Sequence, residues 1–335
     1  MNPIQPISNR PPEISVTAPV SAALERVKQV LFRPFDLGKW FVIGFCAWLA
    51  LLGQQGGSGG NFNLGSPGSH NGDGFTEEFH RAKDYVMDNL GWIVPAAVAL
   101  LVVVVALAIL FNWLSSRGRF MFLHCVALNK AEVAVPWNQF AREANSLFLF
   151  RLVLGLIGAV LSLPLVALIA ILVIGMVKAG EANAAGVALS AVALLAAFAL
   201  GVTFFVIRKL TMDFVVPIMF LRRKKCRESW RELRGLFSGN VGNFILYFLF
   251  QIVLAMVIGM MMLIVIIATC CIAGCFMAIP YLGTVLLLPV HVFNRAYSLY
   301  YLAQFGREFD VFPTEPTAAP GGVPPFPSAG GLAAA

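Results

Sequence analysis

Long apolar runs separated by short polar segments dominate this chain. A hydrocarbon core about 30 Å thick is crossed by about 20 residues of α-helix, so runs of this length predict transmembrane helices. The runs predict six spans, at residues 38–53, 92–113, 147–177, 187–207, 243–267 and 272–293. We therefore expect an all-α fold, a polytopic transmembrane helical bundle within a membrane domain of residues 20–306.

The segments that flank these runs are amphipathic. One of them places four apolar residues on a single helical face, namely Val20, Leu24, Val27 and Leu31. Such a pattern predicts a short helix that lies in the membrane interface. Residues 120–128 are apolar but too short to span, and residues 130–145 add aromatic and basic side chains. We expect cytoplasmic interfacial segments there as well.

Both ends of the chain differ in composition from the membrane domain. Residues 1–19 are rich in proline, and residues 307–335 in proline, alanine and glycine. Proline interrupts helix and sheet alike, so both ends are predicted to be disordered tails. The first of them contains no apolar run of the length that a secretory signal needs, and we expect no cleaved signal peptide.

Lysine and arginine are distributed unevenly between alternate loops. Six spans place all but three of the 24 Lys and Arg residues on one side, the exceptions being Arg81, Lys83 and Lys178. Basic loops remain on the cytoplasmic side of a membrane. The distribution therefore predicts a multi-pass protein of the cell (inner) membrane with both termini in the cytoplasm.

The composition agrees with this class of protein. The chain is 59% hydrophobic and 12% charged, whereas soluble domains contain about 25% charged residues. Its formal net charge of +7 does not indicate nucleic acid. The cations cluster beside the spans, where membrane orientation and anionic lipid head groups account for them. We expect the lipid bilayer as a partner and no nucleic acid.

The three predicted hairpins have similar sequence patterns. A charged amphipathic segment precedes each odd-numbered span, and a charged residue with a short apolar stretch follows each even-numbered span, as at Arg119, Asp213 and Arg295. One interpretation is three copies of one hairpin unit. The other is that basic, amphipathic ends border any membrane hairpin, and the sequence leaves both open.

The most basic segment lies between the fourth and fifth predicted spans. Seven of its cations form what we call the basic collar: Arg222, Arg223, Lys224, Lys225, Arg227, Arg231 and Arg234. Cations beside a membrane attract anionic lipid head groups, and such a surface also suits a membrane or cytoplasmic protein partner. We predict the basic collar as a surface that binds lipid or a partner.

Polar residues in the last two spans form a second candidate site. This intramembrane polar site comprises His291, Asn294, Arg295 and Gln251. Ionisable groups at membrane depth commonly mark functional sites, and Asn112 and Arg151 reach this one if the helices pack suitably. Alternatively, Arg295 extends to the interface and Gln251 only joins two helices by a hydrogen bond.

Cysteine and histidine do not form a recognisable metal site. Cys270, Cys271 and Cys275 cluster at a predicted turn, but no His, Asp or Glu adjoins them, and free cysteine behaves as a small apolar residue. A soft metal or a disulfide is the less favoured interpretation. His70 and His80 flank acidic residues in the outer loop, at a spacing that matches no metal motif. We expect no metal and no cofactor.

The sequence also lacks the motifs of common enzymes. It contains no Gly-x-x-x-x-Gly-Lys-Ser/Thr loop and no His-Glu-x-x-His, and the predicted spans hold essentially no carboxylate. Phosphate cleavage, metal-dependent hydrolysis and proton pumping need such groups. We therefore expect a protein that is not an enzyme.

Three segments resemble a known family of membrane proteins. They are Leu31-Phe-Arg-Pro-Phe-Asp-Leu-Gly-Lys-Trp40, the stretch from Asp213-Phe-Val-Val-Pro217 to Trp230, and Ile279-Pro-Tyr-Leu-Gly283 to Tyr301. The chain resembles an uncharacterised bacterial and archaeal family of six-helix membrane proteins. That family is similar to the membrane module that precedes the catalytic domain of some glycerophosphoryl diester phosphodiesterases. The resemblance implies a membrane domain without an activity of its own, and no catalytic residue carries over.

Two functions from different classes fit these features. We favour a non-enzymatic membrane scaffold, or a lipid-binding or partner-binding protein, that acts through the basic collar. The alternative is a carrier or channel for a small or lipid-like solute, with the proline-containing third and sixth spans along the path and His291 or Gln251 inside it. A membrane-embedded lipid enzyme is a third class, for which the catalytic residues are lacking.

Overall fold

Every regular element is helical in the computed structural model, which describes residues 14–52, 85, 87–179, 184–269 and 272–312. This confirms the prediction of an all-α fold. In chain order the elements are α1 (Ala18–Val27), η1 (Lys28–Phe32), α2 (Leu37–Leu51), α4 (Leu90–Leu128), α5 (Ala134–Gln139), α6 (Ala141–Ala179), α7 (Ala184–Leu210), η3 (Thr211–Val215), α8 (Val216–Arg222), α9 (Cys226–Gly239), α10 (Val241–Ala268), α11 (Ile272–Ala278), α12 (Pro280–Leu286), α13 (Leu288–Ala303) and η4 (Arg307–Phe309).

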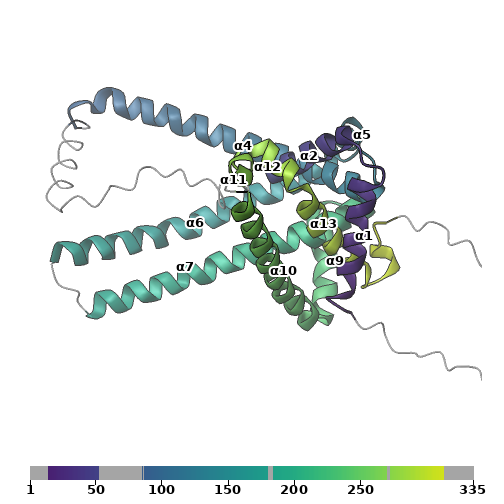
Figure 1. Cartoon of the computed structure of the whole chain (residues 1–335). Coiled ribbons are helices and arrows are strands. Elements are labelled where there is room, and N and C mark those ends of the chain that lie inside the picture. Colours follow the sequence, from purple (N-terminus) through teal and green to yellow (C-terminus); the bar gives the residue numbers. More distant parts are fainter. Residues whose placement is uncertain (1–13, 53–84, 86, 180–183, 270–271, 313–335) are drawn as a thin grey trace, which may run out of the picture.

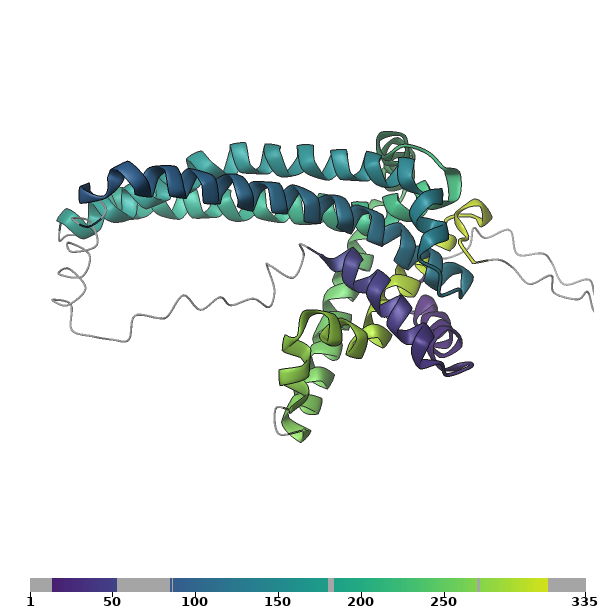
Figure 2. The same cartoon turned by 90° about the horizontal axis from the view of Figure 1, so that it is seen from above.

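Three long helices, α4, α6 and α7, extend together away from the rest of the molecule (Figure 1). Seen from above, α10 to α12 project in a different direction (Figure 2). Among the described residues, four helical segments are long and apolar enough to cross a membrane: Gly91–Leu128, Ala141–Met176, Ala184–Arg222 and Val241–Ala268. Almost none of the residues in their most apolar stretches is buried, as expected of surfaces that lipid covers. They contain four of the predicted spans, which agrees with a polytopic membrane protein.

The first and last predicted spans do not form single long helices. α2 has 15 residues, fewer than the roughly 20 that a bilayer core requires. The predicted span 272–293 is divided among α11, α12 and α13. Pro280 lacks a backbone N–H, and Ile279 before it is extended, which interrupts the helix. Six continuous spans are therefore not confirmed, and the threefold repeat stays a prediction.

The long helices continue into the protein core. We predicted residues 120–128 as a separate interfacial segment, but α4 runs without a break to Leu128, and Phe120 and Leu123 are fully buried. α7 likewise continues through the π-helical turn η3 into α8. Large aromatic side chains fill much of this core, namely Phe120, Phe214, Phe244, Tyr247, Tyr297 and Tyr301. The core thus lies at one end of the three long helices.

The N-terminal amphipathic helix packs against protein. α1 contacts α13, and its buried face includes Ala23 and Val27, whereas Leu24 is 50% exposed. The predicted apolar face of α1 is thus only partly covered by protein, and its position in the membrane interface stays a prediction. The orientation of α1 is set by Arg26, whose guanidinium donates to the carbonyl oxygens of Val126 and Ala127 at the end of α4.

The ordered domain extends further than residues 20–306. Near its start, the backbone N–H of Ser15 donates to Gln304 Oε1 at 2.8 Å. Beyond Gly306, Phe309 is buried in η4, and the Phe312 ring stacks on Tyr300 with 4.2 Å between centroids. Contacts with the core therefore reach beyond the predicted membrane domain, to Ser15 before it and to Phe312 after it. Residues 1–13 and 313–335 lie outside the described ranges.

Candidate functional site

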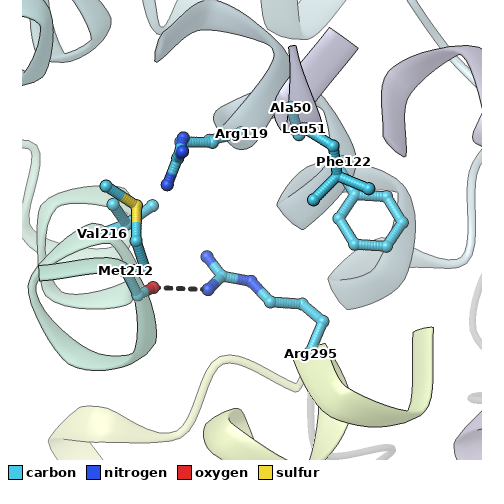
Figure 3. A pocket seen from close by; sticks show the side chains of 7 residues that line it. All are labelled: Ala50, Leu51, Arg119, Phe122, Met212, Val216 and Arg295. Atoms are coloured by element: carbon cyan, nitrogen blue, oxygen red, sulfur yellow. Dashed lines mark hydrogen bonds between the residues drawn. The ribbon is translucent and has the colours of Figure 1, made fainter. Parts of the chain in front are cut away.

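A small cavity lies where α2, α4, η3, α8 and α13 meet, with a volume of about 140 Å³. Arg119 from α4 and Arg295 from α13 line it, and both guanidinium groups point into the shared space (Figure 3). The remaining lining residues are Ala50, Leu51, Phe122, Met212 and Val216. Two cations thus meet in an otherwise apolar enclosure, which we call the arginine cavity.

Contacts at the end of α4 hold Arg119 in place. Arg26 binds two of the last carbonyl oxygens of α4, and Lys39 Nζ donates to Asn129 Oδ1 at 2.7 Å just beyond the helix. Cations are favourable at a helix C-terminus, where the final carbonyls lack intrahelical partners. These contacts come from α1 and α2, so both helices help to set the rotation of α4 that turns Arg119 inward.

Arg295 reaches the cavity through a contact with η3. Its Nη1 donates to the carbonyl oxygen of Met212 at 2.7 Å, drawn as the dashed line in Figure 3. A π-helical turn alters the local hydrogen-bond pattern, and such turns are frequent at functional sites. The π-helical turn η3, between α7 and α8, therefore supplies the carbonyl oxygen that orients the Arg295 side chain.

Both arginines keep donors without an acceptor. Arg119 is only 7% exposed, yet its Nε and Nη2 have no hydrogen-bond partner in the described part of the chain, and neither has Arg295 Nε. Removing an ion from water costs several kcal/mol unless a partner compensates it. The cavity therefore contains cationic donors that an anion would satisfy.

Positive charge also predominates around the cavity. The charges of Arg151, Arg208 and Arg295 repel that of Arg119, and Asp213 attracts it. Asp213 already forms an ion pair with Lys209 at 2.8 Å and accepts a hydrogen bond from Tyr247 Oη at 2.9 Å. One carboxylate, itself paired with a lysine, does not balance four arginines.

The lining of the cavity suits binding better than chemistry. Guanidinium groups bind phosphate and carboxylate oxygens through paired hydrogen bonds. Among the described residues, those that line the cavity include no Asp, Glu, His, Cys, Ser or Thr to act as a nucleophile or general base. The arrangement can hold an anion between two buried cations.

One member of the predicted intramembrane polar site, Arg295, lines the cavity. His291 lies one helical turn before it on α13 and is half-buried, as is Asn294. Gln251 Nε2 donates to Tyr247 Oη at 3.1 Å and so joins the network around Asp213. Both residues belong to α10, so this bond does not join two helices, and Tyr247 makes the contact with Asp213 of η3.

Sequence reasoning missed Arg119, which it treated only as the basic end of a span. Arg151 contacts α4, where its Nη1 lies 3.0 Å from Ser116 Oγ and 3.3 Å from the Asn112 carbonyl oxygen, and its contact with the predicted polar cluster stays a prediction. The helical spacing of the polar residues on α4 could have pointed to Arg119. It lies seven residues after Asn112, so the two share one face of α4.

The basic collar divides into two parts. Arg222 and Lys224 form ion pairs with Glu232, and the Arg223 guanidinium lies 3.9 Å from the centroid of the Phe140 ring. These three cations hold α8, α9 and α5 together. All seven cations are exposed, but the other four, Lys225, Arg227, Arg231 and Arg234, form no ion pair with a described residue. Spacings of four and three residues place the last three on one face of α9, which we call the arginine stripe.

The cysteine and histidine predictions are only partly within the described residues. Cys270, Cys271, His70 and His80 lie outside them, and Cys275 is exposed. In the basic collar, burial raises the pKa of the Cys226 thiol to about 12. That thiol is protonated and unreactive at neutral pH.

Comparison with known proteins finds a matching family model but no matching curated protein or solved structure. A family model described as a family of unknown function (DUF7544) matches residues 14–288. No curated protein and no solved structure matches the chain. The resemblance to an uncharacterised family is thus supported, whereas the similarity to the phosphodiesterase membrane module stays a prediction.

Proposed function

Because the chain belongs to a family of unknown function (DUF7544), we propose its function from its own geometry: it is a non-enzymatic membrane protein that binds the phosphate-bearing head group of an anionic lipid. The observation that carries this proposal is the arginine cavity, where Arg119 and Arg295 point into one space without a lining carboxylate. A phosphate group would satisfy their free donors and reduce the repulsion between them.

A lipid is the favoured source of this phosphate. The cavity lies at the end of helices whose apolar surfaces are exposed along most of their length, so lipid is the molecule at highest local concentration beside them. A soluble phosphate is the other source of the same chemistry. The two sources differ in whether an acyl chain contributes to binding, which an experiment can separate.

Neutralising Arg119 tests the proposed function. We expect the purified full-length protein to retain phosphatidic acid in preference to phosphatidylcholine in native mass spectrometry. Arg119→Gln is expected to reduce that retention about 10- to 100-fold, because a hydrogen bond to a charged group contributes about 1.5–3 kcal/mol.

Arg142→Gln is the matched control, since it removes one exposed charge that belongs neither to the arginine cavity nor to the arginine stripe. Equal retention by Arg119→Gln and the unaltered protein would contradict the proposal. Saturation of the site by inorganic phosphate with no preference for the lipid would assign the cavity to a soluble anion instead.

The arginine stripe supports a second contact with the membrane or with a partner. Arg227, Arg231 and Arg234 are exposed and form no ion pair with any described residue. Each such cation near an anionic surface contributes about 1 kcal/mol. We include in the proposal that this face of α9 binds anionic head groups, or an acidic face of a membrane or cytoplasmic protein, as a scaffold would.

We further propose an inner-membrane topology of six crossings with both termini in the cytoplasm. The lysine and arginine asymmetry and the four long apolar helices support it, with α2 and the α11–α13 segment completing the crossings. A reporter inserted in the loop between α2 and α4 is expected to respond outside the cytoplasm, and one placed after Phe312 inside it. Reversal of either reporter would contradict this topology.

Transport of a lipid-like solute is the second candidate function. The interruption between α11 and α12 favours it, because discontinuous helices border the substrate sites of many transporters. This function requires that reconstituted protein moves labelled anionic lipid between the two leaflets. Binding alone requires no such movement, so a leaflet assay in proteoliposomes distinguishes the two.

A further inference from the structure

A second and larger cavity lies between the long helices α4, α6 and α7, with a volume of about 860 Å³. This volume is within the range of about 300–1,000 Å³ that ligand sites occupy. Its walls are mainly apolar, with Val105 and Ile109 from α4, Leu156 from α6 and Phe204 from α7. We call this cavity the three-helix groove.

Cations mark one part of the groove. Arg151 and Arg208 line it together with Asn112, and these are its charged and amide-bearing lining residues in the described part of the chain. Arg151 is held by the hydroxyl groups of Ser115 and Ser116, which are neutral acceptors, so its charge is not cancelled. The groove thus combines apolar walls with two arginines.

The three-helix groove and the arginine cavity are aligned along the same helices. On α4, Ile109 and Asn112 face the groove and Arg119 faces the cavity; their spacings of three and seven residues keep them on one side of a helix. On the α7–η3 helix, Arg208 lines the groove and Met212, about one turn later, lines the cavity. A molecule lying along this face would extend from apolar walls to four arginines.

We propose that the three-helix groove binds one acyl chain of an anionic phospholipid whose phosphate is held by the arginines at its end. This inference rests on the proposed function and specifies its ligand. The apolar walls match the chain, and Arg151 and Arg208 match the negative head group. A soluble phosphate would use the arginines and leave the groove unoccupied by a chain.

Glycine residues of α6 keep the groove open. A Cβ atom at Gly155 would meet nothing within 4 Å, and one at Gly158 would contact the Phe204 ring at 3.5 Å. Side chains larger than hydrogen at these positions would occupy the space between the helices. Gly155 is therefore a position where the groove can be filled without disturbing the backbone.

Filling the groove tests the inference. Gly155→Phe is expected to reduce the retention of dioleoyl phosphatidic acid in native mass spectrometry by about tenfold or more, because losing the burial of two CH₂ groups already accounts for such a factor. Gly175→Phe is the matched control on the same helix, since a Cβ there also meets nothing within 4 Å and Gly175 does not line the groove. The stabilisation of the protein by glycerol 3-phosphate, which has no acyl chain, is expected to be unchanged in both variants.

The outcomes separate this inference from the proposed function. If Gly155→Phe retains the lipid while Arg119→Gln loses it, the groove is not the chain site and the arginine cavity still binds the head group. If neither variant loses the lipid, both proposals are wrong. Should Gly155→Phe fail to fold, Ala108→Leu fills the groove from α4, and full retention by that variant overturns the inference.

Discussion

Gly118→Leu is expected to separate α2 from α4 and to unfold the core. A Cβ atom at Gly118 would lie 2.5 Å from the Ala50 backbone nitrogen and 2.5 Å from the Leu49 carbonyl carbon. Backbone atoms of a packed helix do not yield as a flexible side chain does, and overpacking costs about 1–3 kcal/mol or more when the backbone must shift. The thermal midpoint of the detergent-purified variant is expected to fall sharply, with loss of a monodisperse peak in gel filtration.

The same substitution is expected to abolish binding, because α2 supplies Ala50 and Leu51 to the arginine cavity. Gly91→Leu is the matched control at the start of α4, where a Cβ meets nothing within 4 Å. It is expected to leave the thermal midpoint unchanged or slightly raised, since glycine is the poorer helix former. A Gly118→Leu protein that melts like the unaltered one would show that α2 does not pack on α4 in this way.

The long helices could be predicted because their signal is local. A run of about 20 apolar residues specifies a helix in lipid without information about its neighbours, and α4, α6, α7 and α10 contain four of the six predicted spans. α2 and the α11–α13 segment were less predictable. Their lengths and breaks depend on Pro280 and on packing against other helices, which hydrophobicity alone does not report.

The arginines of the cavity were harder to predict, because counting charges along the sequence does not show which way each side chain points. Arg117 and Arg119 are two residues apart, and about 200° of rotation separates them on a helix. The Arg117 guanidinium stacks near Trp113 and Trp137, at 4.8 and 4.7 Å from the ring centroids, whereas Arg119 points into the cavity. Both fit a basic span end equally well, and only the packing of α2 and α13 distinguishes them.

The basic collar shows the same limit in another form. The sequence treated its seven cations as one surface, yet Arg222 and Lys224 pair with Glu232, while Arg227 and Arg231 form no ion pair with a described residue. The helical period of α9 contains the distinction, because Arg227, Arg231 and Arg234 share one face. The positions of the cations in the sequence were enough to predict a basic surface. The ion pairs in the structure show which of these cations remain unpaired and can bind a ligand.

Arg119→Met is expected to raise the thermal midpoint of the protein in the absence of anionic lipid and to lower it, relative to the unaltered protein, when anionic lipid is present. In delipidated protein in a neutral detergent, the variant is expected to be more stable, because a buried ion without a partner costs several kcal/mol and methionine keeps an unbranched stem in the same space. Phosphatidic acid stabilises only protein that binds it, by about 2.7 kcal/mol at 100 times the dissociation constant. Adding this lipid is therefore expected to raise the thermal midpoint of the unaltered protein well above its own delipidated value and to leave that of Arg119→Met nearly unchanged.

The matched control for this reversal is Arg142→Met, which removes an exposed charge that lies outside the arginine cavity and the arginine stripe. Surface substitutions usually change stability by no more than about 0.5 kcal/mol, so this variant is expected to follow the unaltered protein in both conditions. If Arg119→Met lowers the thermal midpoint equally with and without phosphatidic acid, Arg119 stabilises the fold and does not bind the lipid. A change of sign that is seen with Arg119→Met and not with the control would mean that the bound anion offsets the cost of burying the Arg119 charge. The substitution removes this charge but keeps an unbranched side chain against the apolar wall of the cavity.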